Sequence, residues 1–208
     1  MKLTGLLIAL CLIGFVYPLF FVDNYGLFID EYGFSGQNFV TKPWVLITSI
    51  FLHADLMHLL SNVLVLFFFG IAVEAEIGKK MLPIFFLGAF LGDFLSILVY
   101  GFESVGIGAS AGVFALVGAG ILLRPFDFSF FPLIVPVPLA LVGIMYAVIN
   151  VYGFITDPTG QISYIAHFGG LFVGLYFGFR SAERRGLKLL LLIFLVMILA
   201  PLIWLIML

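Results

Sequence analysis

Residues 58–74 read HLLSNVLVLFFFGIAVE, and this stretch decides the class of the fold. It holds no Asp, Glu, Lys or Arg before Glu74. A helix that crosses the hydrocarbon core of a bilayer, about 30 Å thick, needs about 20 largely apolar residues. The stretch is continuously apolar, whereas a strand of a membrane barrel alternates apolar and polar residues. It therefore predicts a membrane-spanning helix.

The composition of the whole chain extends this prediction. Of its 208 residues, 64% are hydrophobic and 10% are charged, and the mean hydropathy is +1.30. Soluble globular proteins have about 45–50% apolar and about 25% charged residues, so we expect an integral membrane protein. A net charge of -2 excludes the basic excess that nucleic-acid binding would need. The single cysteine, Cys11, has no partner for an internal disulfide.

Six further apolar runs share the character of the first stretch. The run 5–22 is followed by Asp23 and Asn24 rather than by the small residues of a signal-peptide cleavage site, which favours a retained helix. The run 187–208 has no charge after Lys188 and is long enough to cross a membrane. We expect an all-α membrane protein with six core helices and a seventh C-terminal transmembrane helix. Its single domain spans 1–208, with segments at about 5–22, 58–74, 81–100, 109–123, 136–153, 163–180 and 187–208.

The lysines and arginines indicate the orientation of these segments. With the N-terminus in the cytoplasm, eight of the nine Lys and Arg residues fall inside and only Lys42 falls outside. Positive residues accumulate in cytoplasmic loops. We therefore expect a multi-pass protein whose long connection 23–57 lies in the outer membrane interface. The lack of an obvious transit sequence favours a plasma membrane.

This topology places five polar residues in the outer half of the membrane: His53, His58, Asn62, Ser110 and His167. Ionisable groups at membrane depth are costly, which makes them candidates for function. A lone buried histidine is more often a packed structural residue. Three histidines, an asparagine and a helix-initial serine at one depth favour a shared site instead.

Ser110 and His167 suit nucleophilic catalysis. A serine at a helix N-terminus lies beside unpaired backbone N–H groups, which stabilise an oxyanion. No lysine lies at that depth, so histidine is the base that fits. His167 lies three residues before Gly170, whose GxxxGxxxG run lets helices approach closely, so we predict hydrogen-bond reach between Ser110 and His167. His58 and Asn62 are four residues apart and share one helix face as donors to the oxyanion.

Together these residues resemble the rhomboid family of intramembrane serine proteases. The matching motifs are HxxxxHxxxN at 53–62, GxSx at 108–111 and AHxxGxxxG at 166–174. They occur in the family's order, and they include every histidine of the chain.

The resemblance implies a Ser–His dyad in which Ser110 is the nucleophile and His167 the general base. His58, Asn62 and the backbone N–H of Ser110 would form the oxyanion hole. The pocket would open to the outer side, and the substrates would be transmembrane helices cut near their outer ends, with no cofactor and no metal. The supporting pocket residues would be His53, Gly108 and Phe114.

Three positions depart from the family pattern. Ala111 stands where the family usually has the last glycine of GxSG. Phe114 keeps the aromatic ring expected beside the histidine and lacks the hydroxyl of a tyrosine. Trp44 is followed by Val45, where the family often has an arginine. None of these changes removes a catalytic group.

Two other functions stay open. A catalytically inactive relative that binds transmembrane helices typically lacks the serine or the histidine, and this chain has both. A transporter or metal carrier would use the three histidines as ligands, but the sequence has no HExxH motif and no acid beside them at ligand spacing. Outside the candidate site, Asp93 either lines a wet cavity or polarises a neighbour, or its carboxyl group is satisfied by Ser96 or by another helix. Glu74 is interpreted as scaffold.

Overall fold

The structure of this chain is a computed structural model that describes residues 2–128, 137–157 and 162–181. Every named element in these ranges is a helix, and the sole β feature there is an isolated bridge between Phe34 and Gly106. The predicted all-α class is therefore confirmed. The elements are α1 (Lys2–Phe21), α2 (Tyr25–Tyr32), α3 (Gly36–Thr41), α4 (Val45–Phe51), α5 (Leu56–Ile77), the 3-10 helix η1 (Gly78–Lys80), α6 (Met81–Tyr100), α7 (Ser110–Leu123), α8 (Leu139–Thr156) and α9 (Tyr164–Ser181).

Three helical stretches within the described ranges are long and apolar enough to cross a membrane. They are Lys2–Phe21, the stretch Leu56–Tyr100 that contains α5 and α6, and Leu139–Thr156. The apolar helix α7 is shorter. The segment expected at 187–208 lies outside the described residues, so the seventh helix stays a prediction.

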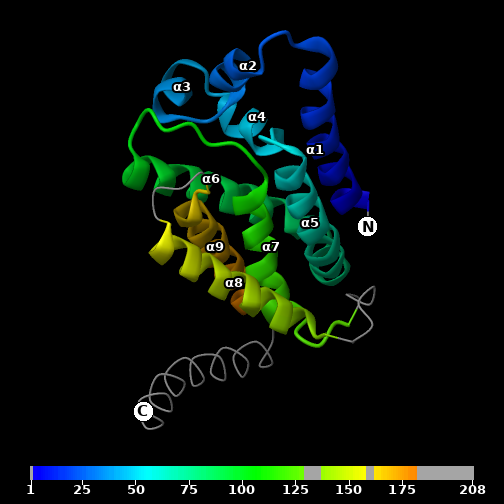
Figure 1. The fold of residues 1–208 in the computed structure, drawn as a ribbon. Coiled ribbons are helices and arrows are strands. Elements are labelled where there is room, and N and C mark those ends of the chain that lie inside the picture. The colour runs from blue at the N-terminus through cyan, green and yellow to red at the C-terminus, as the bar shows by residue number, and fades with distance from the viewer. Residues whose placement is uncertain (1, 129–136, 158–161, 182–208) are drawn as a thin grey trace.

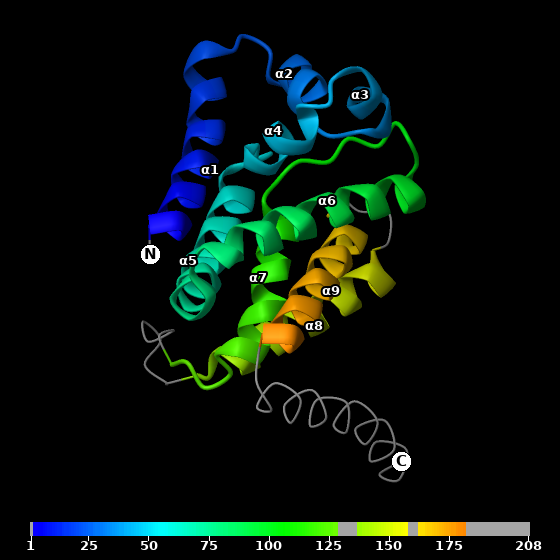
Figure 2. The ribbon, with the colours of Figure 1, turned by 180° about the vertical axis from the view of Figure 1, so that it is seen from behind.

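Helix α7 is the centre of the fold (Figures 1 and 2). All its residues from Ala111 to Leu122 are buried, because α5, α6, α8 and α9 pack around it. Helix α9 approaches it through glycines. A Cβ atom on Gly170 would lie 1.9 Å from the carbonyl oxygen of Ala111, and one on Gly174 would lie 2.0 Å from that of Ala115. The close helix contact predicted from the GxxxGxxxG run is confirmed.

Helix α6 contacts the same two alanines of α7. A Cβ atom on Gly88 would lie 2.4 Å from the Cβ of Ala115, and one on Gly92 would lie 2.7 Å from the Cβ of Ala111. We call this group the small-residue core. It lets three helix backbones meet where larger side chains would hold them apart. Its members are Gly88, Gly92, Ala111, Ala115, Gly170 and Gly174.

The start of α1 is fixed to the end of α5. The carboxylate of Glu74 accepts hydrogen bonds from the backbone N–H groups of Leu3 and Thr4, at 3.1 and 2.9 Å, and from the Thr4 hydroxyl at 2.7 Å. These contacts satisfy N–H groups at a helix N-terminus, which have no partner within their own helix. They support the interpretation of Glu74 as scaffold.

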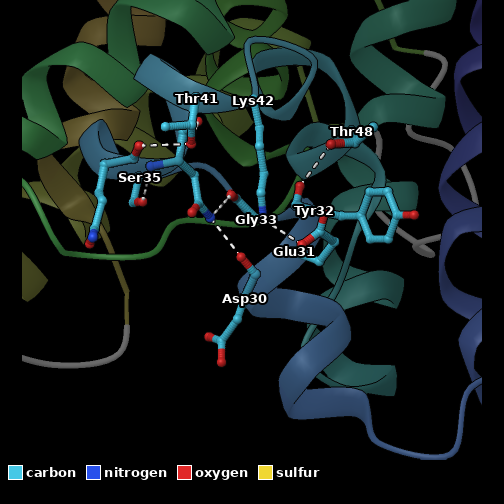
Figure 3. Close-up of polar contacts among 10 residues, drawn as sticks. Asp30, Glu31, Tyr32, Gly33, Ser35, Thr41, Lys42 and Thr48 are labelled. Atoms are coloured by element: carbon cyan, nitrogen blue, oxygen red, sulfur yellow. Dashed lines mark hydrogen bonds and ion pairs between the residues drawn. The ribbon is translucent and has the colours of Figure 1, made fainter.

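The connection between α1 and α5, residues 22–55, folds into the short helices α2, α3 and α4 at one end of the bundle (Figures 1 and 2). Polar contacts hold the connection together (Figure 3). The amide of Asn38 donates to the carbonyls of Asp30 and Gly33, the Thr48 hydroxyl donates to the carbonyl of Tyr32, and Lys42 forms an ion pair with Glu31. The connection is therefore an ordered part of the fold.

Candidate active site at the start of helix α7

Ser110 is the first residue of α7 and is half-buried. The loop before it turns at Gly108, whose φ of +116° lies in a region that residues with a side chain rarely adopt. The backbone N–H of Gly108 donates to the carbonyl of Ser49 at 2.9 Å. Intrahelical bonding begins with Val113, whose N–H donates to Ala109. The N–H groups of the first turn, including that of Ser110, therefore have no partner within the helix.

His167 lies in the first turn of α9, and two contacts hold its ring. Its imidazole stacks on the ring of Phe114, with centroids 4.4 Å apart and an interplanar angle of 11°. Its Nδ1 atom lies 2.7 Å from Oδ1 of Asn150 on α8. Since Phe114 is four residues after Ser110, one turn of α7 further on, its stacking places His167 against the face of α7 that carries Ser110.

The small-residue core positions these two helices. Gly170 lies against the Ala111 carbonyl, next to Ser110 in the chain, and His167 lies one turn before Gly170. Ser110 and His167 are thus at the same end of the α7–α9 contact. No hydrogen bond joins these two residues, both of which the structure describes, so the predicted hydrogen-bond reach stays a prediction.

His58 faces the loop that leads to Ser110. A Cβ atom on Gly108 would lie 2.7 Å from Nε2 of His58. The other ring nitrogen, Nδ1, accepts a hydrogen bond from the backbone N–H of Ala54 at 3.3 Å. A neutral imidazole has one donor and one acceptor nitrogen, so Nε2 carries the proton and is a donor toward this loop.

Asn62 is buried, at 5% exposure, one turn after His58 in α5. Its Nδ2 atom donates to the carbonyl oxygen of His58 at 2.8 Å. One of its two amide hydrogens is therefore engaged within α5, and the structure shows no contact between Asn62 and Ser110. Its assignment to the oxyanion hole stays a prediction.

His53 lies before α5, and its ring packs against the ring of His58. Its ring is completely buried and meets the ring of His58 at a centroid distance of 5.0 Å. Its Nδ1 atom lies 3.3 Å from the carbonyl oxygen of Phe51, and its own carbonyl oxygen accepts the hydroxyl of Tyr25 at 2.6 Å. Burial, followed by the nearby His58, lowers the pKa of His53 to about 4, although the bond to Phe51 opposes this. His53 is therefore neutral near pH 7.

The α1–α5 connection also holds the loop 101–109. Phe34 and Gly106 exchange two backbone hydrogen bonds, of 3.0 and 2.7 Å. The N–H of Gln37 donates to the carbonyl of Phe102 at 3.2 Å. Together with the bond from Gly108 to Ser49, these contacts attach the loop 101–109, which precedes Ser110, to the α1–α5 connection at three places.

Two other predictions concern side chains beside the site. Oδ2 of Asp93 is buried and has no hydrogen-bond partner among the described residues. The hydroxyl of Ser96 instead contacts Gly92 O at 3.1 Å and the hydroxyl of Ser163 at 2.7 Å. Within the described ranges, no three His, Cys, Asp or Glu side chains are grouped as ligands of one metal ion.

Asn150 and Tyr25 make contacts with the site that the sequence did not predict. Asn150 stands alone in the apolar run of α8, and a polar side chain in such a run is itself a signal of function. Its partner His167 is 17 residues away. Tyr25 is one of several aromatic residues in the connection, and nothing in the sequence distinguishes its hydroxyl from that of Tyr32.

The fold and these contacts define a helical integral membrane protein with a serine and histidines gathered at the start of its central helix. The family model described as the Rhomboid domain matches residues 40–184, which is more than half of the chain. The chain therefore belongs to the rhomboid family, as its motifs indicated.

Individual relatives agree with this placement. The chain is 28% identical to RHOMBOID-like protein 12, mitochondrial, of Arabidopsis thaliana, over 74% of this chain and 52% of that protein. It is 32% identical to Rhomboid-related protein 1 of Caenorhabditis elegans, over 66% of this chain and 40% of that protein. Rhomboid-like protease 3 of Toxoplasma gondii is 34% identical over 36% of this chain and 28% of its own length. The chain thus spans about half or less of these relatives.

Proposed function

We propose that this rhomboid-family protein is an intramembrane serine endopeptidase that cleaves transmembrane helices near their outer ends. One observation carries the proposal. Ser110 opens a helix whose first N–H groups have no partner within the helix, with the His167 ring on the same helix face and the His58 donor facing the preceding loop. A nucleophile, a base and an oxyanion donor thus come from three helices.

The chemistry follows from these positions. Ser110 Oγ attacks the carbonyl carbon of the scissile peptide bond, and its proton passes to Nε2 of His167. The oxyanion is stabilised by the backbone N–H of Ser110, by Nε2–H of His58 and by the second amide hydrogen of Asn62. The C–N bond breaks as His167 returns the proton to the leaving amine, and water then hydrolyses the acyl-enzyme by the same steps. Hydrogen bonds between catalytic groups often tighten only when substrate is bound.

An apolar groove between α5 and α8 supports substrate entry from the bilayer. Its volume is about 330 Å³, and apolar residues of both helices line it. The groove adjoins the site, because the ring of its lining residue Tyr146 lies 5.4 Å from the ring of Phe114 between centroids, and Phe114 stacks on His167. A substrate helix must unwind before its carbonyl reaches Ser110, since helical backbone is satisfied internally. The lining residues are Leu64, Val65, Phe69, Val137, Leu141, Val142, Met145 and Tyr146.

We also propose the membrane orientation indicated by the charges. The N-terminus would be cytoplasmic, and the α1–α5 connection and the start of α7 would face the outer side of a plasma membrane. Exposed apolar residues of the connection, such as Leu27 at 67% and Trp44 at 49%, suit the membrane interface.

A fluorophosphonate probe tests the proposed activity. Purified protein in liposomes would be treated with the probe and, separately, with a single-span membrane protein as substrate. The wild type should be labelled and should cleave. Ser110→Ala and His167→Ala should lose at least about 10³-fold in both assays, since the dyad acts as a unit. Ser104→Ala, which removes an exposed serine of the same loop, is the matched control and should behave as wild type.

Two outcomes would contradict the proposal. A folded wild type that is neither labelled nor cleaves would indicate a protein that binds transmembrane helices without cutting them. Inhibition by a chelator that zinc reverses would favour a metal-dependent function of the histidines.

A further inference from the structure

Asn150 of α8 makes a polar contact with His167, the proposed base. Its side chain is buried, at 2% exposure, and its Oδ1 atom lies 2.7 Å from Nδ1 of His167. We propose that Asn150 is a positioning residue that orients His167 and keeps its proton on Nδ1. The proposal rests on the peptidase function proposed above, because only a base needs its other nitrogen free.

The amide orientation is determined by a second contact. Nδ2 of Asn150 donates to the carbonyl oxygen of Tyr164 at 3.2 Å. This bond leaves Oδ1 as the atom that faces His167. A carbonyl oxygen only accepts hydrogen bonds, so Nδ1 of His167 must carry the proton.

Protonation of Nδ1 determines the state of the other ring nitrogen, Nε2. A neutral imidazole protonated at Nδ1 has its lone pair at Nε2. This is the tautomer that can take a proton from a serine, and a wrong tautomer disables a serine–histidine pair. Asn150 would thus supply the function that an aspartate or asparagine has in other hydrolase triads.

The neighbours of Asn150 show that it faces inward. Ile149 and Val151 are 57% and 43% exposed, on the side of α8 that would meet lipid. A buried amide in an apolar helix is costly unless its polar atoms are bonded, and both bonds of Asn150 go to α9. The ring of His167 is then held at one edge by Asn150 and on one face by Phe114.

Asn150 also links the base to the groove. The helix that carries it lines the groove between α5 and α8 through Leu141, Val142 and Met145. The orientation of the base therefore depends on the position of α8.

The test combines histidine ¹⁵N NMR with probe labelling of full-length protein in detergent. The chain has only three histidines, so the ring signals of His167 are those absent from His167→Ala. The wild type should show His167 protonated at Nδ1. In Asn150→Leu the proton should move to Nε2 in most molecules, and labelling of Ser110 should slow at least about tenfold, up to the roughly 10⁴-fold loss known for a wrong tautomer.

Further variants keep the test decisive. Asn150→Ala removes the acceptor without adding volume and should behave like Asn150→Leu if the leucine variant fails to fold. Asn150→Asp keeps an acceptor and should retain the Nδ1–H tautomer. Thr156→Val is the matched control, because it removes another side-chain hydrogen bond of α8, from the Thr156 hydroxyl to Tyr152 O, away from His167.

Three results would overturn the role of Asn150: Nε2–H in the wild type, Nδ1–H retained in the folded leucine and alanine variants, or labelling of those variants as fast as Thr156→Val. A wild type that is not labelled at all would instead contradict the peptidase function. The NMR result needs no turnover, so it decides the orientation of His167 in either case.

Discussion

The small-residue core and the α1–α5 connection both hold parts of the candidate site, by different means. The core holds α7, which carries Ser110, against α9, which carries His167, through direct contact of helix backbones, with a Cβ on Gly170 only 1.9 Å from the Ala111 carbonyl. The connection holds His58 and the loop before Ser110 through individual hydrogen bonds, such as those between Phe34 and Gly106. The positions of the proposed nucleophile and base thus depend on packing, and the position of the proposed oxyanion donor His58 depends on hydrogen bonding.

The two halves of the site are therefore sensitive to different substitutions. Closely packed helices do not tolerate added side-chain volume, which typically costs about 1–3 kcal/mol of stability and sometimes more. A single hydrogen bond contributes a net of about 1 kcal/mol, so the connection should tolerate the loss of one contact. Substitutions that add volume in the core should therefore have larger effects than substitutions that remove one bond in the connection.

Gly170→Ala should have the largest effect. The new methyl group would overlap the Ala111 carbonyl, so α7 and α9 must separate and Ser110 must move away from His167. A misplacement of about 1 Å can cost about 10²-fold in rate, and the strain adds to this. We expect a lower melting temperature in detergent and no detectable probe labelling.

Gly5→Ala in α1 is the control for this change, because a Cβ atom there would meet nothing within 4 Å. Equal melting temperatures and labelling rates for the two variants would show that the contact between α7 and α9 does not limit the site.

Gly108→Ala tests the oxyanion side. The added Cβ would lie 2.7 Å from Nε2 of His58 and would push this donor away. Loss of one oxyanion donor costs about 10²- to 10³-fold in turnover, so labelling should slow by about 10²-fold.

Gly101→Ala separates this contact from backbone strain. Gly101 also has a positive φ, +96° against +116° for Gly108, but a Cβ there would meet nothing within 4 Å. The strain alone costs about 1–3 kcal/mol of stability. If both variants lose the same stability and only Gly108→Ala is labelled more slowly, displacement of His58 is the cause of the slower labelling. Equal losses of labelling rate would refute the role of His58.

The contrast also separates what the sequence could predict from what it could not. The predicted runs 81–100 and 109–123 coincide closely with α6 and α7, because glycine or charged residues flank both apolar runs. The glycine spacing identified the α7–α9 contact, because small residues four apart make one face of a helix.

The site residues show the limit of this reasoning. Ser110, His167 and His58 belong to short motifs and could be found from them. Asn150 and Tyr25 act through contacts 17 and 28 residues away in sequence, which only the packed fold defines. The short helices α2–α4 were not predicted individually, since their hydrogen bonds come from caps and tertiary contacts rather than from apolar periodicity.

Tyr25→Phe should have the smallest effect, and it tests the connection at one bond. Its hydroxyl donates to the carbonyl of His53, whose ring packs on His58. A bond of about 1 kcal/mol corresponds to a several-fold change in rate. We expect a three- to tenfold lower kcat with an unchanged KM, because in the proposed mechanism the bond positions the oxyanion donor His58 rather than the substrate.

Tyr32→Phe is the matched control on the same helix, and its rate should equal that of the wild type. Burial, followed by the charge of Asp55, raises the pKa of Tyr25 above its ordinary value of about 10. The bond's contribution is therefore fully present below about pH 10 and is lost as the pH rises through the raised pKa. If Tyr25→Phe instead raises KM alone, α2 contacts the substrate and the division between a packed and a hydrogen-bonded half no longer describes the site.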